Sequence, residues 1–329
     1  MTVHDLGQRA TIEVHLGPDD LRSALRDDVR RGLTDWPKHL PPKWFYDARG
    51  SHLFDEITRL PEYYPTRRET EILEREASTI AGLTGAATLL ELGSGTSTKT
   101  RLLLDALAAA GTLRRIVVFD VSEPVLREAA PQLAGRYGVD VHAVVGDFER
   151  HLGRLPTGDR TLIAFLGGTI GNLRPPERAR FLRQVRERLG PDDHLLLGTD
   201  LVKDPGRLVA AYDDAAGVTA EFNRNVLHVL NRELGGDLAP DRFRHVALWN
   251  DAERWIEMHL EADGTQDARL QALGLDVHLD DGERIHTEIS AKLTTDGVDG
   301  ELVAAGLDPV AAWTDAAGDF LVTLSRRER

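Results

Sequence analysis

The chain has 329 residues, with 40 lysines and arginines against 54 aspartates and glutamates, and therefore a net charge of −14 at pH 7. Hydrophobic residues make up 41% and charged residues 29%, which is typical of a globular protein and excludes disorder along the whole chain. The negative charge disfavours binding to nucleic acid or to anionic membranes. The absence of cysteine excludes disulfides, cysteine-bound metals and cysteine nucleophiles.

The sequence also argues against secretion and membrane insertion. Residues 1–17 contain no continuous apolar stretch of the kind that a signal peptide needs. No window approaches the roughly 20 apolar residues that span a bilayer. We therefore expect a cytoplasmic protein whose partner is a small molecule, with no nucleic acid and no membrane.

The N-terminal part is predicted to be helical, with two aromatic, proline-containing loops. Leucine or valine recurs every fourth residue between residues 21 and 33, which predicts a helix. The loops cover 41–47 and 60–65. Thr66 and Glu69 then have the spacing of a capping box, which predicts that a further helix begins there.

From residue 87 onward the pattern changes to alternating strands and helices. Short apolar runs predict strands at 87–92, 115–120, 139–145, 161–166 and 194–199, and the clearest helix covers 175–189. This alternation predicts a parallel sheet with helices on both faces. Beyond residue 200 we expect helix over 204–234, strands within 243–260 and 267–292, and a last strand at 319–325. A second region, built from the N-terminal part and residues of about 200–290, thus interrupts the doubly wound core.

A glycine-rich turn follows the first strand of this core, in the segment ELGSGT at 91–96. Gly93 would let the backbone approach a ligand closely and direct helix N–H groups at it. Thr98 stands where a dinucleotide fingerprint needs glycine, and it also breaks the P-loop pattern before Lys99. The turn resembles motif I of Rossmann-like S-adenosylmethionine methyltransferases; a purely structural turn is the alternative.

Acidic residues end the next two strands. Asp120 can accept hydrogen bonds from both hydroxyls of a ribose. Asp147 can accept from the amine of adenine, while Phe148 packs on the ring. Each acid alone is also compatible with a helix cap. Because ligands of open α/β sheets bind at the carboxyl ends of the strands, the three motifs together predict an adenosine-containing methyl donor.

The fourth strand leads into a segment rich in glycine, GGTIGN at 167–172. Glycine and asparagine tolerate unusual backbone angles beside a ligand, although an ordinary loop is the alternative. The fourth strand end faces the methyl group in this fold class, so Asn172 is a candidate to hold the acceptor. Gly167 and Gly168 would leave room for successive methyl groups on one amine.

Other chemistries have little support. The 12 histidines include no H-E-x-x-H pattern, and Glu257-x-His259 lies on a predicted strand without a matching partner pattern. A packed or solvated face is the better interpretation of that pair, so no metal is predicted. A nucleotide-binding regulator and an NAD-dependent dehydrogenase are the alternatives from other classes, and Thr98 disfavours the dehydrogenase.

Several longer sequence segments show a specific resemblance to one protein family. From about residue 18 to its end, the chain resembles the histidine-specific Nα-methyltransferases of ergothioneine biosynthesis. The segments that carry the resemblance are LPPKWFYD at 40–47, RLPEYYPTR at 59–67, ELGSGTS at 91–97, TIGNL at 169–173, GTDLVKD at 198–204, AYDDAAGVTA at 211–220 and FNRNVL at 222–227.

The resemblance implies a reaction and an architecture. S-adenosylmethionine would donate three methyl groups to the α-amino nitrogen of L-histidine, giving hercynine; another amino acid or small amine on the same fold is the alternative. The fold would be a class I, Rossmann-like α/β methyltransferase sheet with a second, discontinuous α+β domain. The S-adenosylmethionine-binding domain would comprise 67–202 plus 292–329, and the substrate-binding domain 1–66 plus 203–291. We expect a monomer.

The resemblance also implies site residues. The cofactor site would contain Gly93, Lys99, Asp120, Asp147 and Phe148, and the histidine site Tyr46, Tyr63, Gly167, Asn172, Tyr212, Glu288, Ile289 and Ser290. Phenol and amide groups can donate hydrogen bonds to the carboxylate of the histidine substrate. Glu288 and Ser290 are two positions apart on a predicted strand and therefore share a face, on which both can accept imidazole N–H groups. Direct displacement needs no obligatory catalytic residue, only positioning by Tyr46 and Asn172.

Overall fold

The computed structural model describes residues 2–7, 9–94, 99–156 and 158–328, and it divides into two compact units. Unit 1 comprises Met1–Gly17, Pro65–Val202 and Leu293–Arg329, and unit 2 comprises Pro18–Tyr64 and Lys203–Lys292. Within the described residues, none of the helices combines the length and the apolar character that crossing a membrane would need.

Unit 1 is built on one sheet with the strand order β1-β2-β5-β4-β3-β6-β7-β14-β13. The pairs from β2 to β7 are parallel, whereas β1, β14 and β13 join antiparallel. The strands are β1 (Thr2–Gly7), β2 (Ala10–Val14), β3 (Thr88–Leu92), β4 (Arg115–Asp120), β5 (Asp140–Val145), β6 (Thr161–Phe165), β7 (His194–Asp200), β13 (Leu307–Thr314) and β14 (Phe320–Arg327).

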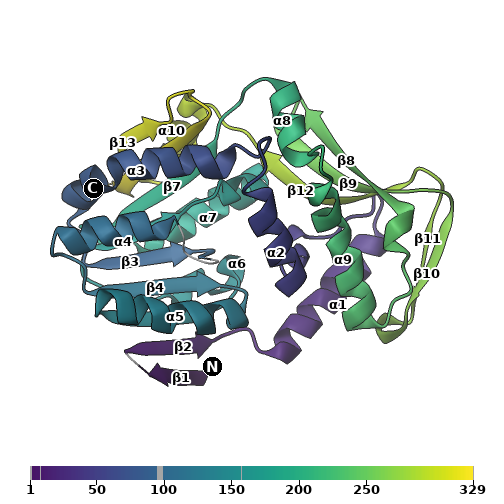
Figure 1. Ribbon diagram of the computed structural model, residues 1–329, viewed down its shortest axis with the longest axis horizontal. Helices are drawn as coiled ribbons and strands as arrows, with labels where there is room; N and C mark the ends of the chain where they lie inside the picture. The colour runs from purple at the N-terminus through teal and green to yellow at the C-terminus, as the bar shows by residue number, and fades with distance from the viewer. Residues whose placement is uncertain (1, 8, 95–98, 157, 329) are drawn as a thin grey trace. The chain divides into compact units, whose positions relative to one another are not determined.

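Helices cover both faces of this sheet. They are α3 (Pro65–Thr84), α4 (Thr100–Ala109), α5 (Glu123–Tyr137), α6 (Phe148–His151), α7 (Pro175–Arg188) and α10 (Thr295–Ala304), with short 3₁₀ turns η2 (Leu152–Arg154) and η3 (Thr169–Asn172). Figure 1 shows α4 and α5 in front of the strands and α7 behind them. Phe181 of α7 and Leu302 of α10 pack on one set of alternating strand residues, among them Leu90, Val117 and Ile163. The central strands β3 and β6 are buried on both faces, which explains why their sequences are continuous apolar runs.

The N-terminal residues correct the predicted domain limits. Residues 1–17 were expected in the substrate-binding domain, but β2 pairs in parallel with β5 and β1 pairs with β2, so this segment belongs to unit 1. The sequence signal is weak here because β1 is an exposed edge strand and β2 has only five residues.

Unit 2 combines helices with small antiparallel sheets. One sheet has the order β12-β9-β8, and β10 pairs with β11. The elements are α1 (Pro18–Thr34), η1 (Pro42–Phe45), α2 (Ala48–Ile57), α8 (Pro205–Tyr212), α9 (Val218–Leu234), η4 (Pro240–Arg242), β8 (Phe243–Asn250), β9 (Trp255–Ala262), β10 (Gln266–Leu270), η5 (Gln271–Leu273), β11 (Leu275–Leu279) and β12 (Arg284–Ala291).

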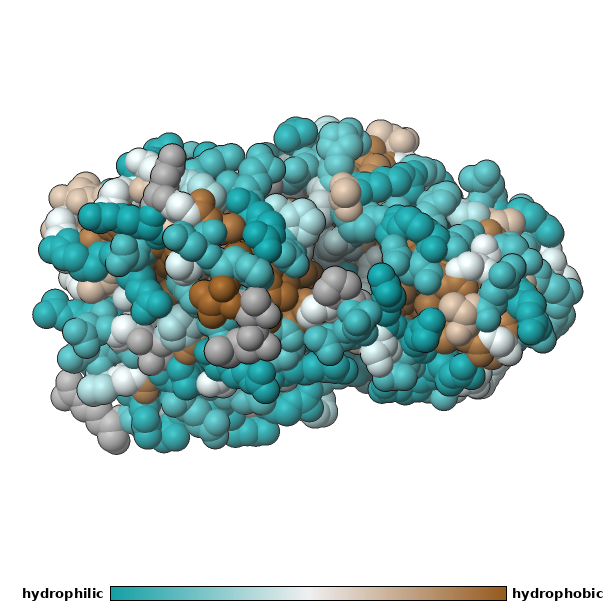
Figure 2. Space-filling model, turned by 90° about the horizontal axis from the view of Figure 1, so that it is seen from below, coloured by the Kyte–Doolittle hydropathy of each residue, from teal (hydrophilic) through white to brown (hydrophobic). Residues whose placement is uncertain are grey.

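The core of unit 2 forms between these helices and one face of the β12-β9-β8 sheet. Val29 of α1, Val226 of α9 and Ile256, Met258 and Leu260 of β9 belong to one buried cluster. The three β9 residues alternate, as expected for a strand with one buried face. The face of the molecule shown in Figure 2 is largely hydrophilic, as the charged composition leads one to expect.

Candidate active site

The predicted ligand-binding motifs of unit 1 lie at one edge of its sheet. Strands β5, β4, β3 and β6 are neighbours and parallel, so their carboxyl ends meet at the same edge. Gly93 follows β3, Asp120 ends β4, Asp147 follows β5 and Gly167 follows β6. The rest of the glycine-rich turn, residues 95–98, lies outside the described residues.

Gly93 has a backbone conformation that favours glycine. Its φ is +71°, and its N–H donates to the carbonyl of Phe119 at 2.8 Å. A Cβ added at Gly93 would have no described heavy atom within 4 Å. Conformation, rather than crowding by the described residues, therefore favours glycine here.

Local hydrogen bonds hold the Asp120 carboxylate and the backbone of Asp147 at the strand ends. The N–H of Ser122 donates to Asp120 Oδ1 at 2.9 Å, which fixes the carboxylate at the end of β4. The N–H of Asp147 donates to His151 Nδ1 at 3.1 Å. Phe148 packs its ring against Phe165 and Phe181, with centroids 5.5 and 5.7 Å away, so its position is set by the core of unit 1.

A buried carboxylate that the sequence did not single out for the site connects two of the predicted site residues. Glu69 is fully buried, accepts the N–H of Gly167 at 2.8 and 2.9 Å, and forms an ion pair with Lys99. A Cβ on Gly198 would lie 2.1 Å from Glu69 Oε1, so this glycine makes room for the carboxylate. The network fixes the backbone at Gly167 and places the Lys99 ammonium beside it.

This network corrects the expected capping box. Helix α3 begins at Pro65, so Thr66 lies inside the helix, and Glu69 turns to Gly167 and Lys99 instead. A Cβ on Gly168 would lie 3.6 Å from the ring of Phe320, which is an ordinary van der Waals contact. Asn172 ends η3 and is half-buried.

Three predicted tyrosines of unit 2 belong to one aromatic cluster. Tyr63 and Tyr212 have ring centroids 6.2 Å apart, and Tyr63 lies 6.1 Å from Phe54. Tyr46 lies 5.7 Å from Phe54 and 5.4 Å from Phe222. The edge-to-face geometry of these contacts is a favourable one for aromatic rings. Residues from α2, α8, α9 and the two proline-containing loops are thereby brought together.

A buried polar group adjoins this cluster. The Tyr212 hydroxyl and Ser290 Oγ are 2.7 Å apart, and Lys292 Nζ donates to both, at 2.9 and 2.8 Å. Lys292 is only 2% exposed, and its ammonium lies 4.6 Å from the centroid of the Tyr212 ring. Sequence reasoning missed Lys292, although a lysine within the apolar end of a predicted strand was a signal for it.

The backbone of Tyr212 is fixed by His245. His245 Nε2 lies 2.7 Å from the Tyr212 carbonyl, and Nδ1 lies 2.8 Å from Asn223 Nδ2. Because a carbonyl can only accept, Nε2 carries the ring proton and Nδ1 accepts from the amide. Burial lowers the pKa of His245 below its ordinary 6.5, which favours this neutral tautomer although the hydrogen bond to Tyr212 opposes the shift.

Glu288 and Ser290 share one side of β12, as their spacing predicts, and this side faces the core. Glu288 pairs with Met258 and Ser290 with Ile256, and both partners belong to the core of unit 2. Glu288 is 8% exposed. Ile289 lies on the opposite face, where it packs with Trp255 and Ala291. A contact between Ile289 and a ligand on the Glu288 side would therefore use its backbone.

The sheet order and the residues at its carboxyl edge define the class. A sheet ordered β5-β4-β3-β6-β7-β14-β13, with β14 antiparallel beside β7, is that of a class I S-adenosylmethionine-dependent methyltransferase. The family model described as "Histidine-specific methyltransferase, SAM-dependent" matches residues 25–327. The chain belongs to this family, and S-adenosylmethionine is accordingly its methyl donor.

Known proteins support this assignment over nearly the whole chain. The chain is 56% identical to a histidine N-alpha-methyltransferase of Mycobacterium tuberculosis, covering 97% of this chain and 100% of the relative. It is also 56% identical to a protein of the same name from Mycolicibacterium smegmatis, covering 95% and 98%. It is 32% identical to ergothioneine biosynthesis protein 1 of Neurospora crassa, covering 93% of this chain and 34% of that protein.

Proposed function

We propose that this enzyme transfers three methyl groups from S-adenosylmethionine to the α-amino nitrogen of L-histidine, forming hercynine for ergothioneine biosynthesis. The relationship to proteins named histidine N-alpha-methyltransferase, which spans both units at 56% identity, is the observation that carries the proposal. The polar groups on the core-facing side of β12 support it, because an amino acid with a polar ring needs such partners. Methylation of another amino acid or small amine is the alternative.

The donor side of the proposal assigns roles to unit 1. Asp120 would accept the ribose hydroxyls, since a carboxylate offers two acceptor oxygens, and Asp147 would accept from the adenine amine. Gly93, with its positive φ and no described heavy atom within 4 Å of an added Cβ, would let the backbone approach the donor. When bound, S-adenosylmethionine supplies an electrophilic methyl group on a positively charged sulfur.

Lys99 and Phe148 are the other two residues of unit 1 that the proposal assigns to the donor site. Phe148 is fixed by Phe165 and Phe181 and would offer its remaining ring surface to the adenine. The Lys99 ammonium is paired with Glu69, which limits the positive charge it presents. A donor that is itself cationic at sulfur is compatible with such a neutralised lysine.

The histidine side of the proposal assigns roles chiefly to unit 2. Glu288 and Ser290 would accept hydrogen bonds from the imidazole, and Ile289 would contribute its backbone. Tyr63, Tyr212 and Asn172 would donate to the histidine carboxylate, with Tyr46 and Gly167 completing the site. Lys292 would hold Tyr212 and Ser290 in place through the hydrogen bonds described above.

The proposed chemistry is direct displacement. The neutral α-amine attacks the methyl carbon in line with the departing sulfur, and the positive charge passes from sulfur to nitrogen. No covalent enzyme intermediate forms, so orientation supplies much of the rate. Because each transfer removes one amine N–H, residues that hold the carboxylate and the ring, rather than the amine, allow the product to be methylated again.

Product analysis tests this function. The enzyme is incubated with S-adenosylmethionine and each of the twenty amino acids separately, and the products are identified by mass spectrometry. We expect histidine to gain three methyl groups and the other amino acids to stay unmodified. Methylation of a different amino acid with higher kcat/KM would contradict the proposal and favour the alternative. Sedimentation of the active enzyme tests the proposed monomer, and fractionation of source cells tests the proposed cytoplasmic location.

A further inference from the structure

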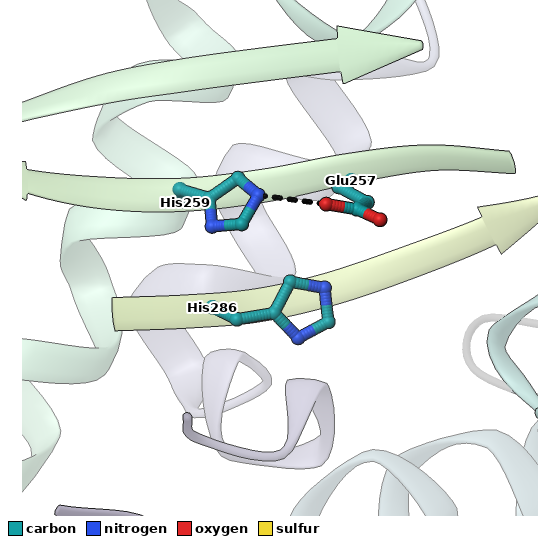
Figure 3. Close-up of side chains that lie close together, drawn as sticks. All are labelled: Glu257, His259 and His286. Carbon is teal, nitrogen blue, oxygen red and sulfur yellow. Dashed lines mark hydrogen bonds and ion pairs between the residues drawn. The ribbon is translucent and has the colours of Figure 1, made fainter. Parts of the chain in front are cut away.

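The outward face of the β12-β9-β8 sheet carries a cluster of metal-binding residue types that the proposed methylation does not use. Glu257 and His259 lie two residues apart on β9, and His286 pairs with His259 across the strands. One potential ligand atom from each residue lies within 4.8 Å of the other two. Figure 3 shows the three side chains projecting together from the two neighbouring strands. The spacing of Glu257 and His259 is visible in the sequence, whereas His286 joins them only through the pairing of β12 with β9.

We propose that Glu257, His259 and His286 form a binding site for a divalent transition-metal ion, best suited to Zn²⁺. Two imidazoles and one carboxylate are a ligand set that Zn²⁺ accepts, with water in the fourth position. Mg²⁺ and Ca²⁺ prefer sites made of oxygen ligands alone. The proposal concerns the opposite side of the sheet from Glu288 and does not depend on the proposed methylation.

The carboxylate is already oriented for this role. Glu257 Oε1 accepts from Trp255 Nε1 at 2.7 Å and from Asn250 Nδ2 at 2.8 Å. Glu257 Oε2 instead lies 3.1 Å from His259 Nε2. One oxygen is therefore held by two donors while the other points toward the histidines. Carboxylates that bind metals are commonly oriented by hydrogen bonds of this kind.

The two histidines are placed by the strands that carry them. Their ring centroids are 5.0 Å apart. The backbone N–H of His286 donates to the carbonyl of Lys38 and its carbonyl accepts from Leu40, so β12 is fixed at this position. Tetrahedral Zn²⁺ with nitrogen ligands at about 2.0–2.1 Å needs ligand atoms about 3.4 Å apart. Rotation of the side chains would close the remaining distance, since the Cα positions are already those of a cross-strand pair.

The charge state of the cluster also suits a cation. The Glu257 carboxylate supplies a negative charge, and an imidazole binds a metal through its neutral form. The nearby cation Arg284 is neutralised by Glu261, whose Oε2 it meets at 2.7 Å.

A hydrogen-bond network alone would not account for His259. Its Nδ1 is buried, and within the described residues it has no hydrogen-bond partner. Buried polar atoms are nearly always satisfied, so an unpaired nitrogen in a cluster of ligand types calls for a partner. A metal bound by one ring nitrogen commonly leaves the other to water or to a neighbouring acceptor.

A metal at this position would join β9 to β12. The core-facing sides of the same strands carry Met258, Glu288 and Ser290. The ion would therefore stabilise the strand pair on which the proposed imidazole contacts depend, without contacting them. Its binding is measurable by itself, independently of methylation.

The test uses full-length enzyme without an affinity tag, stripped of metal. Titration with ZnCl₂ in a calorimeter should show one saturable equivalent, and MgCl₂ should show none. Co²⁺ should give the visible absorption of a four-coordinate, nitrogen-ligated ion. His259→Ala and His286→Ala should abolish both signals. Trp255→Phe, which removes one hydrogen bond to Glu257, should weaken Zn²⁺ binding by about 10- to 100-fold.

His228→Ala is the matched control. His228 is exposed on α9 and does not belong to the cluster of Glu257, His259 and His286. This variant should bind Zn²⁺ like the wild type. The proposal is overturned if the wild type shows no saturable Zn²⁺ binding and no Co²⁺ absorption, or if His259→Ala and His286→Ala bind as tightly as the wild type. The Co²⁺ spectrum of the wild type decides the question even if a variant fails to fold.

Discussion

Replacing Lys292 by methionine tests how the enzyme holds histidine. Methionine keeps the length of the buried stem and removes the ammonium that donates to Tyr212 at 2.9 Å and to Ser290 at 2.8 Å. The two hydroxyls are 2.7 Å apart and can still bond to each other, so neither is left without a partner. We therefore expect the Lys292→Met protein to fold.

The structure sets the expected magnitudes. A hydrogen bond to a charged group contributes about 1.5–3 kcal/mol, and the bonds of Lys292 to Tyr212 and Ser290 are of this kind. Burying the ammonium costs several kcal/mol, which offsets most of this stabilisation, so the free energy of unfolding should change by only about 0–2 kcal/mol. Histidine binding has no such offset. If Lys292 orients and polarises the Tyr212 hydroxyl toward the histidine carboxylate, one such bond corresponds to a loss of about 10- to 150-fold in affinity.

The assay is histidine binding by calorimetry, together with kcat/KM, for Lys292→Met, Tyr212→Phe and the double variant. If Lys292 acts through Tyr212, the two effects should be strongly non-additive. Lys38→Met is the control, because Lys38 is also a largely buried lysine of unit 2 but pairs with Glu283. That variant should lose stability and keep its histidine affinity. Unchanged affinity in Lys292→Met, or additive effects with Tyr212→Phe, would refute the positioning role.

Three further predictions concern the donor, the ring and pH. Asp120→Ala should lower the affinity for S-adenosylmethionine by at least about tenfold, as the loss of charge-assisted hydrogen bonds implies, and calorimetry that shows wild-type affinity would remove Asp120 from the donor site. For kcat/KM with histidine we expect wild type above Glu288→Gln and Glu288→Ala lowest, since glutamine keeps an acceptor but loses the charge; equal values would mean that the imidazole is recognised elsewhere. Because the pKa of His245 is lowered in the folded state, the unfolded chain binds more protons below about pH 6.5, and stability should fall on acidification from about pH 7.5 to about pH 5.5. Urea unfolding should show a smaller fall for His245→Gln, and an equal fall would assign the effect to other groups.

The sequence predicted the central strands well because their signal is local. Each is a short apolar run buried on both faces, and the expected strand at 115–120 coincides with β4. Strand β13 was not predicted, since Pro309 interrupts its pattern. The pairing of β13 with β14 shifts register between Pro309 and Ala311, where an edge strand accommodates proline. Helix over 204–234 was expected as one stretch, but Gly217 at φ +76° separates α8 from α9, and Asp214 accepts the first N–H groups of α9.

The candidate site was predictable where residues belong to motifs and not where contacts are distant. Gly93, Asp120 and Asp147 follow successive strands, so topology alone places them at one edge. Glu69 meets Gly167 across 98 positions of sequence, and no local pattern encodes that contact. Lys292 is similarly hidden, because its partner Tyr212 lies 80 residues away. Buried charges of this kind are recognised once their neighbours are known.

One irregularity in β12 explains why the proposed imidazole-binding residues and the proposed metal ligand His286 lie on opposite faces of the same strand. Strict alternation would place His286 on the same face as Glu288 and Ser290, since these residues follow one another at intervals of two positions. Instead the pairing with β9 shifts between His286 and Glu288, so that His286 opposes His259 and Glu288 opposes Met258. The intervening Thr287 is tied down by its hydroxyl, which donates to the Met258 carbonyl at 3.0 Å. A β-bulge thus changes which face each residue occupies: it directs the proposed imidazole partners to the core and leaves the histidine pair on the outer face.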